Sequence, residues 1–159
     1  MDDERELSHL NKAGEVHMVD VGGKEVTDRE AVAEGFVVMS AELAERFFTG
    51  DLLKGDAAAA VRIAGIMAAK RTSELIPLCH PISLTGVEIT LEPSGRGVRV
   101  LASVRTSDRT GVEMEAMTAV AVASLTIYDM VKSVERDVTI EAVRLLTKSG
   151  GRSGKWERG

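Results

Sequence analysis

The stretch VEITLEPSGRGVRVLASV (residues 87–104) indicates the centre of the fold. On both sides of Pro93–Gly97, apolar residues alternate with polar ones, which is the period of a β-strand with one buried face. The intervening segment contains proline and glycine and is typical of a turn between paired strands. The sequence therefore predicts an antiparallel hairpin.

Upstream, the segment 41–49 predicts a short helix. Ser40 precedes it as a suitable N-cap, and Gly50 follows it as a suitable stop. Three apolar side chains of this helix are expected to face inward: Leu43, Phe47 and Phe48.

The run AAAAVRIAGIMAAKR (residues 57–71) predicts a second helix, because its residues have high helix propensity and Asp56 before it can serve as N-cap. Apolar residues cover much of its circumference, so we expect this helix to be well buried.

The remaining segments complete a mixed pattern. Residues 110–136 predict one long helix, and residues 17–21, 29–40 and 138–146 predict strands. In the last strand Ile140 should face inward with either Val143 or Leu145. A hairpin combined with further strands and two substantial helices predicts an α+β fold, with an antiparallel sheet and helices packed on one face.

Length and composition limit the class of protein. A chain of 159 residues without internal repeats is most simply one domain. We expect this domain at residues 11–148, between a disordered N-terminus (1–10) and a flexible, basic, Gly- and Ser-rich tail (149–159). The formal net charge of −5 argues against a nucleic-acid-binding surface.

The compartment is inferred from what the sequence lacks. The single cysteine excludes an internal disulfide and fits a reducing environment. No apolar run approaches the roughly 20 residues that span a bilayer, and the acidic first residues are unlike a signal peptide. We therefore expect a cytoplasmic protein with no membrane partner.

The segment LIPLCHP (residues 75–81) is the first candidate for chemistry. Two prolines make it a rigid extended loop that can hold the imidazole of His80 in place. Adjacent side chains of an extended segment point in opposite directions, so Cys79 and His80 do not suit a catalytic pair. Cys79 is expected to be a small buried hydrophobe, and a structural zinc site would need about four Cys or His ligands. For His80 a functional and a structural role are both open.

Two glutamates flank Met114 near the expected start of the long helix. Thr110 and Glu113 have the spacing of a capping box, in which Glu113 would close the helix start. Glu115 has no such role and is the carboxylate more available to a ligand.

Asp129 and Lys132 lie three residues apart on a mostly apolar part of the same helix. A surface ion pair would explain them, but their apolar surroundings favour a cleft. Lys54 stands just before a helix N-terminus, where an anion would be attracted by both groups. Lys148 opens a Gly- and Ser-rich segment that forms either a loose terminus or a loop that closes on phosphate.

Helix geometry limits how these residues can cooperate. Glu115 and Asp129 are four turns apart on one face, which places them about 21 Å apart on a straight helix. One small-molecule site cannot easily use both from one chain. Either the helix breaks or sites are shared between subunits, and we favour shared sites.

A family resemblance is carried by six segments: HMVDV (17–21), KGD (54–56), RIAGIMAAKRTSELIPLCHP (62–81), GVEMEA (111–116), LTIYDMVK (125–132) and VRLLTKSGGRSG (143–154). Together and in this order they resemble the MoaC-type cyclic pyranopterin monophosphate synthases of molybdenum cofactor biosynthesis. The likeness runs from about residue 8 to residue 155, with no departure at the motif positions.

The resemblance implies a ferredoxin-like subunit assembled into a homohexamer, a trimer of dimers with sites at subunit interfaces. It implies a lyase that converts (8S)-3′,8-cyclo-7,8-dihydro-GTP, made by a radical-SAM GTP cyclase, to cyclic pyranopterin monophosphate and pyrophosphate. No cofactor is required, and Mg²⁺ with the triphosphate is left open. The implied catalytic residues are Asp129, Lys132, Lys54, His80 and Lys148. The implied substrate contacts are Leu78, Cys79, His80, Glu113, Met114 and Glu115.

A non-catalytic, oligomeric nucleotide-binding module is the alternative, with the lysines acting only as a phosphate clamp. Asp129 discriminates between the two, because an anion clamp has no use for a carboxylate three residues from its lysine. Proton transfer does use such a group. A purely structural assembly subunit would leave the basic tail unexplained.

Overall fold

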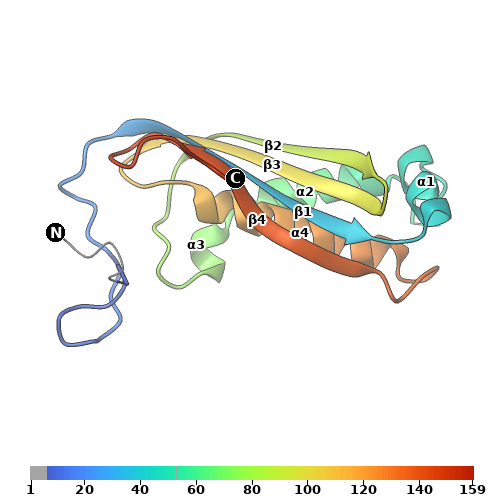
Figure 1. The fold of residues 1–159 in the computed structure, drawn as a ribbon, viewed down its shortest axis with the longest axis horizontal. Helices are drawn as coiled ribbons and strands as arrows, with labels where there is room; N and C mark the ends of the chain where they lie inside the picture. The colour runs from blue at the N-terminus through green and yellow to red at the C-terminus, as the bar shows by residue number, and fades with distance from the viewer. Residues whose placement is uncertain (1–6, 53) are drawn as a thin grey trace.

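One antiparallel sheet of five strands organises the computed structural model, which describes residues 7–52 and 54–159 (Figure 1). Its strands lie side by side in the order β2-β3-β1-β4-β5. The strand bounds are β1 (Thr27–Val38), β2 (Leu84–Ser94), β3 (Gly97–Asp108), β4 (Thr139–Ser149) and β5 (Trp156–Glu157). The predicted hairpin is confirmed as β2 and β3.

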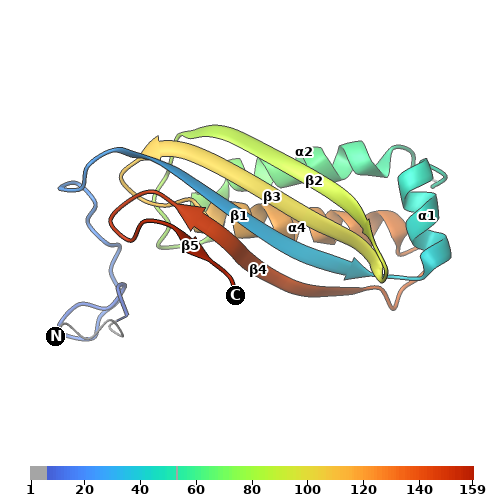
Figure 2. The same ribbon diagram turned by 45° about the horizontal axis from the view of Figure 1, so that its top comes forward.

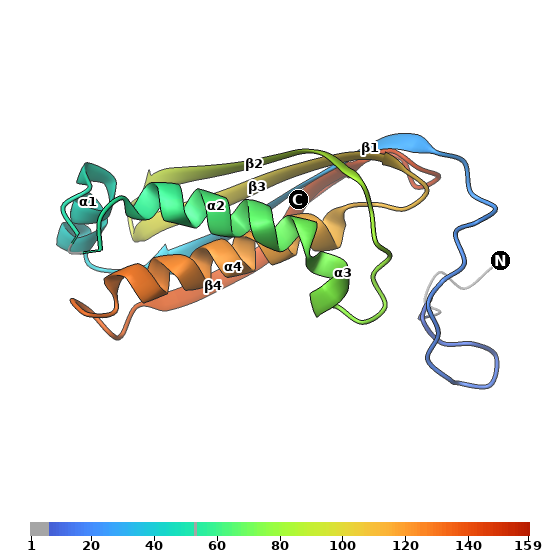
Figure 3. The ribbon, with the colours of Figure 1, turned by 180° about the vertical axis from the view of Figure 1, so that it is seen from behind.

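The helices are α1 (Ala41–Thr49), α2 (Ala57–Lys70), α3 (Thr72–Leu75) and α4 (Glu113–Val131). Figure 3 shows α2 and α4 side by side on one face of the sheet, and Figure 2 shows the other face without helices. The chain order β1-α2-β2-β3-α4-β4, with β1 between β3 and β4, is that of a ferredoxin-like fold. The predicted α+β class is confirmed.

The core lies between the sheet and these two helices. Val98, Val100, Ala102 and Val104 alternate along β3 and are completely buried. Their burial follows directly from the period-two pattern in the sequence. From α4 the core receives Ala116, Ala119, Val120, Ala123 and Ile127.

A close approach between α4 and β1 requires glycine at position 35. A Cβ atom there would lie 2.7 Å from Cγ1 of Val120 and 3.4 Å from Cγ2 of Val143. Any larger residue would push the long helix away from the middle of the sheet. Gly35 thus sets how deeply α4 sits.

A bulge in β4 settles which of its side chains face the core. The register with β1 shifts between Glu34 and Phe36, and Ala142 in this bulge has φ of 52°. The extra residue reverses the alternation, so that Ile140, Val143 and Leu145 all pack against the core. The sequence pattern left Val143 and Leu145 as alternatives because it assumed an unbroken strand.

Both predicted helix caps upstream are confirmed. The Ser40 hydroxyl accepts the N–H of Leu43 at 3.3 Å, and Oδ1 of Asp56 accepts the N–H of Ala59 at 3.0 Å. Phe48, however, is 37% exposed, so the expectation that it faces inward is wrong. It lies next to Phe47 in sequence, and only Phe47 is on the buried side of the helix.

Two further element predictions are wrong. Residues 17–21 form no strand. Before β1, the residues that the structure describes (7–26) contain only an isolated bridge between Leu10 and Val16. The long helix spans 113–131 rather than 110–136. Residues 1–6 of the predicted disordered N-terminus lie outside the described residues, and the flexibility of the tail stays a prediction.

The outer side of α2 is apolar and exposed. Val61 and Ala68 face the core, but Ile63 is 58% exposed and Met67 46%. The expectation of a well-buried helix is therefore wrong for this side in a single chain. Figure 3 shows that α2 lies beside α4 on the same face of the sheet.

By length and hydropathy, α4 is the one helix in the described part of the chain that could span a membrane, with a mean hydropathy of 1.3. The expectation that no apolar run has this length is therefore too strict. The helix packs against α2 and against β1, β3 and β4, and its apolar side chains fill the protein core. Packing identifies it as the core helix of this domain.

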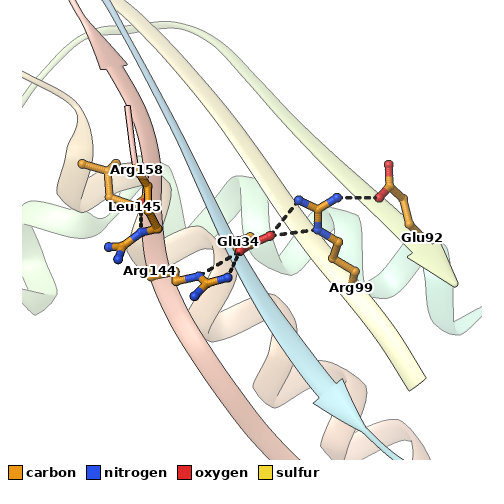
Figure 4. A network of polar contacts seen from close by, with 6 residues as sticks. All are labelled: Glu34, Glu92, Arg99, Arg144, Leu145 and Arg158. Carbon is orange, nitrogen blue, oxygen red and sulfur yellow. Dashed lines mark hydrogen bonds and ion pairs between the residues drawn. The ribbon is translucent and has the colours of Figure 1, made fainter. Parts of the chain in front are cut away.

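The uncovered face of the sheet carries a charged network (Figure 4). Glu34 on β1 points to this face, and its side chain is only 3% exposed. Its two carboxylate oxygens accept from Arg99 on β3 and Arg144 on β4 at 2.7 Å each, and Arg99 also pairs with Glu92 at 3.2 Å. Burial alone would raise the pKa of Glu34, but hydrogen bonds from Arg144 and Arg99 and their positive charges hold it below its usual value.

Candidate functional site

A large open pocket of about 1080 Å³ lies at one end of the molecule. The start of β1, the loop after α3, the start of α4 and the end of β4 all reach this end, as does the N-terminal segment (Figures 1 and 3). Seven of the ten predicted site residues line it: Leu78, Cys79, His80, Glu113, Met114, Glu115 and Lys148.

The proline-bounded loop delivers His80 to this pocket. Nε2 of His80 lies 2.6 Å from the carbonyl oxygen of Val19, which belongs to the N-terminal segment. Cys79 beside it is half-buried at the pocket rather than packed inside, so its expected role as a core residue is only partly met. Burial, and then the charge of Glu115, raise the pKa of the Cys79 thiol, which makes it a poor nucleophile.

Glu113 does not form the predicted capping box. The helix begins at Glu113 itself, with Val112 as N-cap and no side-chain cap. Glu113 instead forms an ion pair with Lys148, with 3.0 Å between Nζ and Oε1. The end of β4 lies beside the first turn of α4, so tertiary structure supplies a partner that local sequence cannot show.

Glu115 is the most unusual carboxyl group of the pocket. The residue is 3% exposed, and burial, with a smaller contribution from the charge of Glu113, raises its pKa to about 7. A carboxyl group with this pKa can give or take a proton near neutral pH.

The other three predicted residues form a separate cluster. Nζ of Lys132 lies 2.8 Å from Oδ1 of Asp129, and Nζ of Lys54 lies 3.4 Å from Oδ2 and 2.7 Å from the Asp129 carbonyl oxygen. The Lys132 hydrogen bond and charge, followed by those of Lys54, lower the pKa of Asp129. The same pair raises the pKa of Lys132. Two ammonium groups on one carboxylate leave excess positive charge for an anion.

The pocket and this cluster lie at opposite ends of α4. The helix is continuous from Glu113 to Val131, so Glu115 and Asp129 are about 21 Å apart along it. The alternative of a broken helix is thereby excluded. Within one chain the ten predicted residues form two groups that do not meet.

Sequence reasoning missed several residues of the pocket wall. Arg29 donates from Nε to the carbonyl of Asp108 at 3.1 Å and from Nη2 to that of Arg109 at 3.2 Å. Its side chain lies against Gly150 and Gly151, both at positive φ, where a Cβ would clash with it. Only the GG pair was a sequence signal here, since Arg29 itself lies in an ordinary strand pattern. Further missed residues are Ser8, His9, Lys24, Glu25, Arg152 and Ser153.

No group of three or more His, Cys, Asp or Glu side chains that could hold a metal ion occurs in residues 7–52 and 54–159. The pocket instead combines Arg29, Lys148 and Arg152 with the two glutamates. The chemistry it offers is therefore proton transfer and anion binding.

Comparison with known proteins agrees with this arrangement. The family model described as MoaC family matches residues 18–151, which covers both clusters. The chain belongs to the MoaC family. A cyclic pyranopterin monophosphate synthase of Chloroflexus aurantiacus is 54% identical over 155 residues, 96% of this chain and 95% of the relative.

Two further relatives show the same extent of similarity. The cyclic pyranopterin monophosphate synthase of Corynebacterium efficiens is 53% identical over 151 residues, 95% of this chain and 97% of its own. Cyclic pyranopterin monophosphate synthase 2 of Mycobacterium tuberculosis is 53% identical over 153 residues, 96% of this chain and 92% of its own. The resemblance found in the sequence motifs is thus confirmed at the level of the family.

Proposed function

We propose that this chain is a cyclic pyranopterin monophosphate synthase of molybdenum cofactor biosynthesis. It converts (8S)-3′,8-cyclo-7,8-dihydro-GTP to cyclic pyranopterin monophosphate and releases pyrophosphate. The main support is identity above 50% to relatives of that name over nearly the whole of both chains. A pocket that combines a carboxyl group of pKa about 7 with several cations suits this reaction.

In this proposal the enzyme is a phosphorus–oxygen lyase. Closing a cyclic phosphate with departure of pyrophosphate needs neutralisation of the triphosphate charge, and rearrangement of the ring needs several proton transfers. Lys54, Lys132 and Lys148 supply cations, while Asp129, His80 and Glu115 supply proton carriers. No resident cofactor takes part, and any Mg²⁺ arrives with the triphosphate.

A complete site would be shared between two subunits of a homohexamer. Two α4 helices packed antiparallel about a two-fold axis near Val122, midway between positions 115 and 129, would bring Glu115 of one chain to Asp129 of the partner subunit. The exposed apolar side chains on α2 and α4 support an interface there: Ile63, Ile66, Met67 and Leu125.

The cellular setting follows from the same proposal. The substrate would be supplied in the cytoplasm by a radical-SAM GTP cyclase, and neither nucleic acid nor a membrane takes part. A net charge of −5 is compatible with this, because a nucleic-acid-binding surface needs an excess of Lys and Arg.

The direct test is incubation of the purified protein with (8S)-3′,8-cyclo-7,8-dihydro-GTP. Pyrophosphate and cyclic pyranopterin monophosphate should appear in equal amounts, with and without EDTA if Mg²⁺ is dispensable. Tight binding of the substrate without release of pyrophosphate would favour the alternative of a nucleotide-binding module.

A further inference from the structure

Residues 7–26 are attached to the pocket at defined points although they form neither a helix nor a regular strand. The Val19 carbonyl accepts from His80, and Nε of Arg109 donates to the carbonyl of Lys24 at 3.1 Å. Between these points Oδ1 of Asp20 accepts the N–H of Gly22 at 2.8 Å. This Asx turn fixes the course of the chain directly after Val19.

The contact between Val19 and His80 has a chemical consequence. A carbonyl oxygen can only accept a hydrogen bond, so Nε2 of His80 must carry a proton to lie 2.6 Å from it. A neutral imidazole has one N–H, and Nδ1 is therefore the nitrogen with the free lone pair. The residues that the structure describes form no hydrogen bond to Nδ1, which leaves this nitrogen available.

We propose that Val19 is a positioning residue that holds His80 as the Nε2–H tautomer, so that Nδ1 is the nitrogen that exchanges a proton with the substrate. The proposal rests on the proposed function for the identity of the substrate. When His80 takes a proton, Nδ1 becomes N–H and the ring becomes a cation. The Val19 carbonyl accepts from Nε2 in both states and stabilises the cation through the same hydrogen bond.

The proposal gives residues 17–21 a role in the site, although they do not form the strand that the sequence predicted. Val19 and Val21 are the half-buried residues of this segment, whereas its other residues are exposed. Both line the pocket together with His80. In this proposal, residues 17–21 act on the site through the backbone carbonyl of Val19, which accepts a hydrogen bond from His80, and not through a side chain.

The first test reads the tautomer without any activity measurement. Long-range ¹H–¹⁵N spectra of the imidazole rings distinguish a protonated from an unprotonated ring nitrogen. The chain has three histidines, and single variants His9→Gln and His17→Gln assign the signals of the third. At a pH where His80 is neutral, Nε2 should be the protonated nitrogen. A ring that is Nδ1–H, or that averages between the two forms, would overturn the proposal.

The second test compares Asp20→Ala with Asp20→Asn. The alanine variant loses the acceptor for the Gly22 N–H, whereas the asparagine variant keeps an oxygen at that position and removes only the charge. Asp20→Ala should increase tautomer averaging of His80 and lower kcat more than Asp20→Asn does.

A third comparison removes the carbonyl itself. A chain that begins at Met18 keeps Val19 and Asp20, whereas a chain that begins with an initiator Met before Val21 lacks both. Asp20→Ala is the control for the loss of the Asp20 side chain. Both shortened chains lack the pocket residues Ser8 and His9, so the absence of these two residues cannot cause a difference between the chains. The shorter chain should show a tautomer mixture and a kcat about tenfold lower, the effect expected when the partner that orients a reactive histidine is removed.

The outcomes distinguish a failure of the proposed role of Val19 from a failure of the proposed function. Equal tautomer spectra and equal kcat in the Met18 and Val21 chains would overturn the role of Val19. If none of the chains releases pyrophosphate, the proposed function fails, and the wild-type spectrum still decides whether His80 is held as Nε2–H.

Discussion

Lys148 and Glu113 are joined by an ion pair of 3.0 Å, which connects the end of β4 to the first turn of α4 at the pocket. Each side chain is 30% exposed, so water still reaches the pair. An ion pair of this kind contributes at most about 1 kcal/mol to stability. Its place in the pocket wall suggests that substrate phosphate can replace Glu113 as the partner of Lys148.

Lys148→Ala should therefore remove most turnover while leaving the fold stable. We expect a loss in kcat/KM of about 100-fold, as for a lost charge-assisted contact to phosphate, and a stability change below about 1 kcal/mol. Pyrophosphate release and thermal unfolding measure the two effects. Lys155→Ala is the control, since Lys155 pairs with Glu157 at an exposed site. A large loss of stability in Lys148→Ala would show that the segment is structural.

The pKa of Glu115 predicts how stability depends on pH. Its value of about 7 in the folded protein lies above the ordinary value of 4.5, so the folded state favours the protonated form. The resulting stability is complete below pH 4.5 and is lost as pH rises through 7. Relative to the wild type, Glu115→Gln should gain stability across this range, by on the order of 3 kcal/mol.

The measurement is urea unfolding of the wild type and Glu115→Gln at pH values from 4 to 8. Glu45→Gln is the control, because this carboxyl group is exposed on α1 and does not line the pocket. A difference between wild type and Glu115→Gln that stays constant with pH would contradict the raised pKa.

Glu34 predicts a pH dependence of opposite sign. Its pKa is held below 4.5, so the network contributes stability above that pH and loses it as acid protonates the carboxylate. Glu34→Gln should destabilise the protein by about 1–3 kcal/mol at pH 7, because one arginine then faces an amide N–H₂ group. The loss should vanish in acid.

A matched control lies on the same sheet. Arg96 and Glu141 form an ion pair at 2.9 Å, but with side chains 67% and 38% exposed. Glu141→Gln should change the free energy of unfolding by less than about 1 kcal/mol at any pH. If Glu34→Gln and Glu141→Gln change the free energy of unfolding equally, burial of the Glu34 network does not contribute to stability.

Asp129→Asn separates chemistry from folding at the other end of α4. The side chain is 58% exposed and makes no core contact, so the variant should fold and assemble normally. It loses the charge that pairs with Lys132 and Lys54, and the ability to accept a proton. Turnover should fall at least 100-fold, the lower range for a general acid or base.

Sizing chromatography checks the assembly of this variant, and pyrophosphate release checks its turnover. Asp137→Asn, also exposed and six residues after the end of α4, should keep wild-type activity. An Asp129→Asn protein that retains more than about a tenth of wild-type kcat would remove Asp129 from the chemistry.

The sequence predicted the features that depend on local periodicity. Alternation along β3 placed Val98 and Val104 in the core, and capping chemistry placed the starts of α1 and α2 at Ser40 and Asp56. These features depend on residues within one or two turns of one another. Local sequence is enough to decide them.

Errors arose where a distant partner decides the outcome. Glu113 had the spacing of a capping residue, but Lys148 from another element pairs with it. Val143 faces the core only because a bulge at Ala142 shifts the register. Residues 17–21 have the apolar pattern of a strand, but the Val19 carbonyl contacts the side chain of His80 instead of a neighbouring strand.

The sequence predicted residues of the candidate site but not how they are arranged in space. Motifs identified the ten side chains, and helix geometry already separated Glu115 from Asp129. The sequence did not show which of the other eight residues lie with each of them. Arg29 was missed because a strand pattern does not show that its side chain braces the turn at Gly150.

The most direct test of the shared site mixes two inactive variants. Subunits of Glu115→Ala and Asp129→Asn are dissociated together and reassembled, with subunit exchange verified by mass spectrometry of tagged chains. A site that takes Glu115 from one chain and Asp129 from the partner subunit is intact in about a quarter of random pairings across a two-fold interface. We therefore predict recovery of about a quarter of wild-type activity. Activity that stays at the level of the separate variants, despite verified exchange, would contradict a site built from two chains.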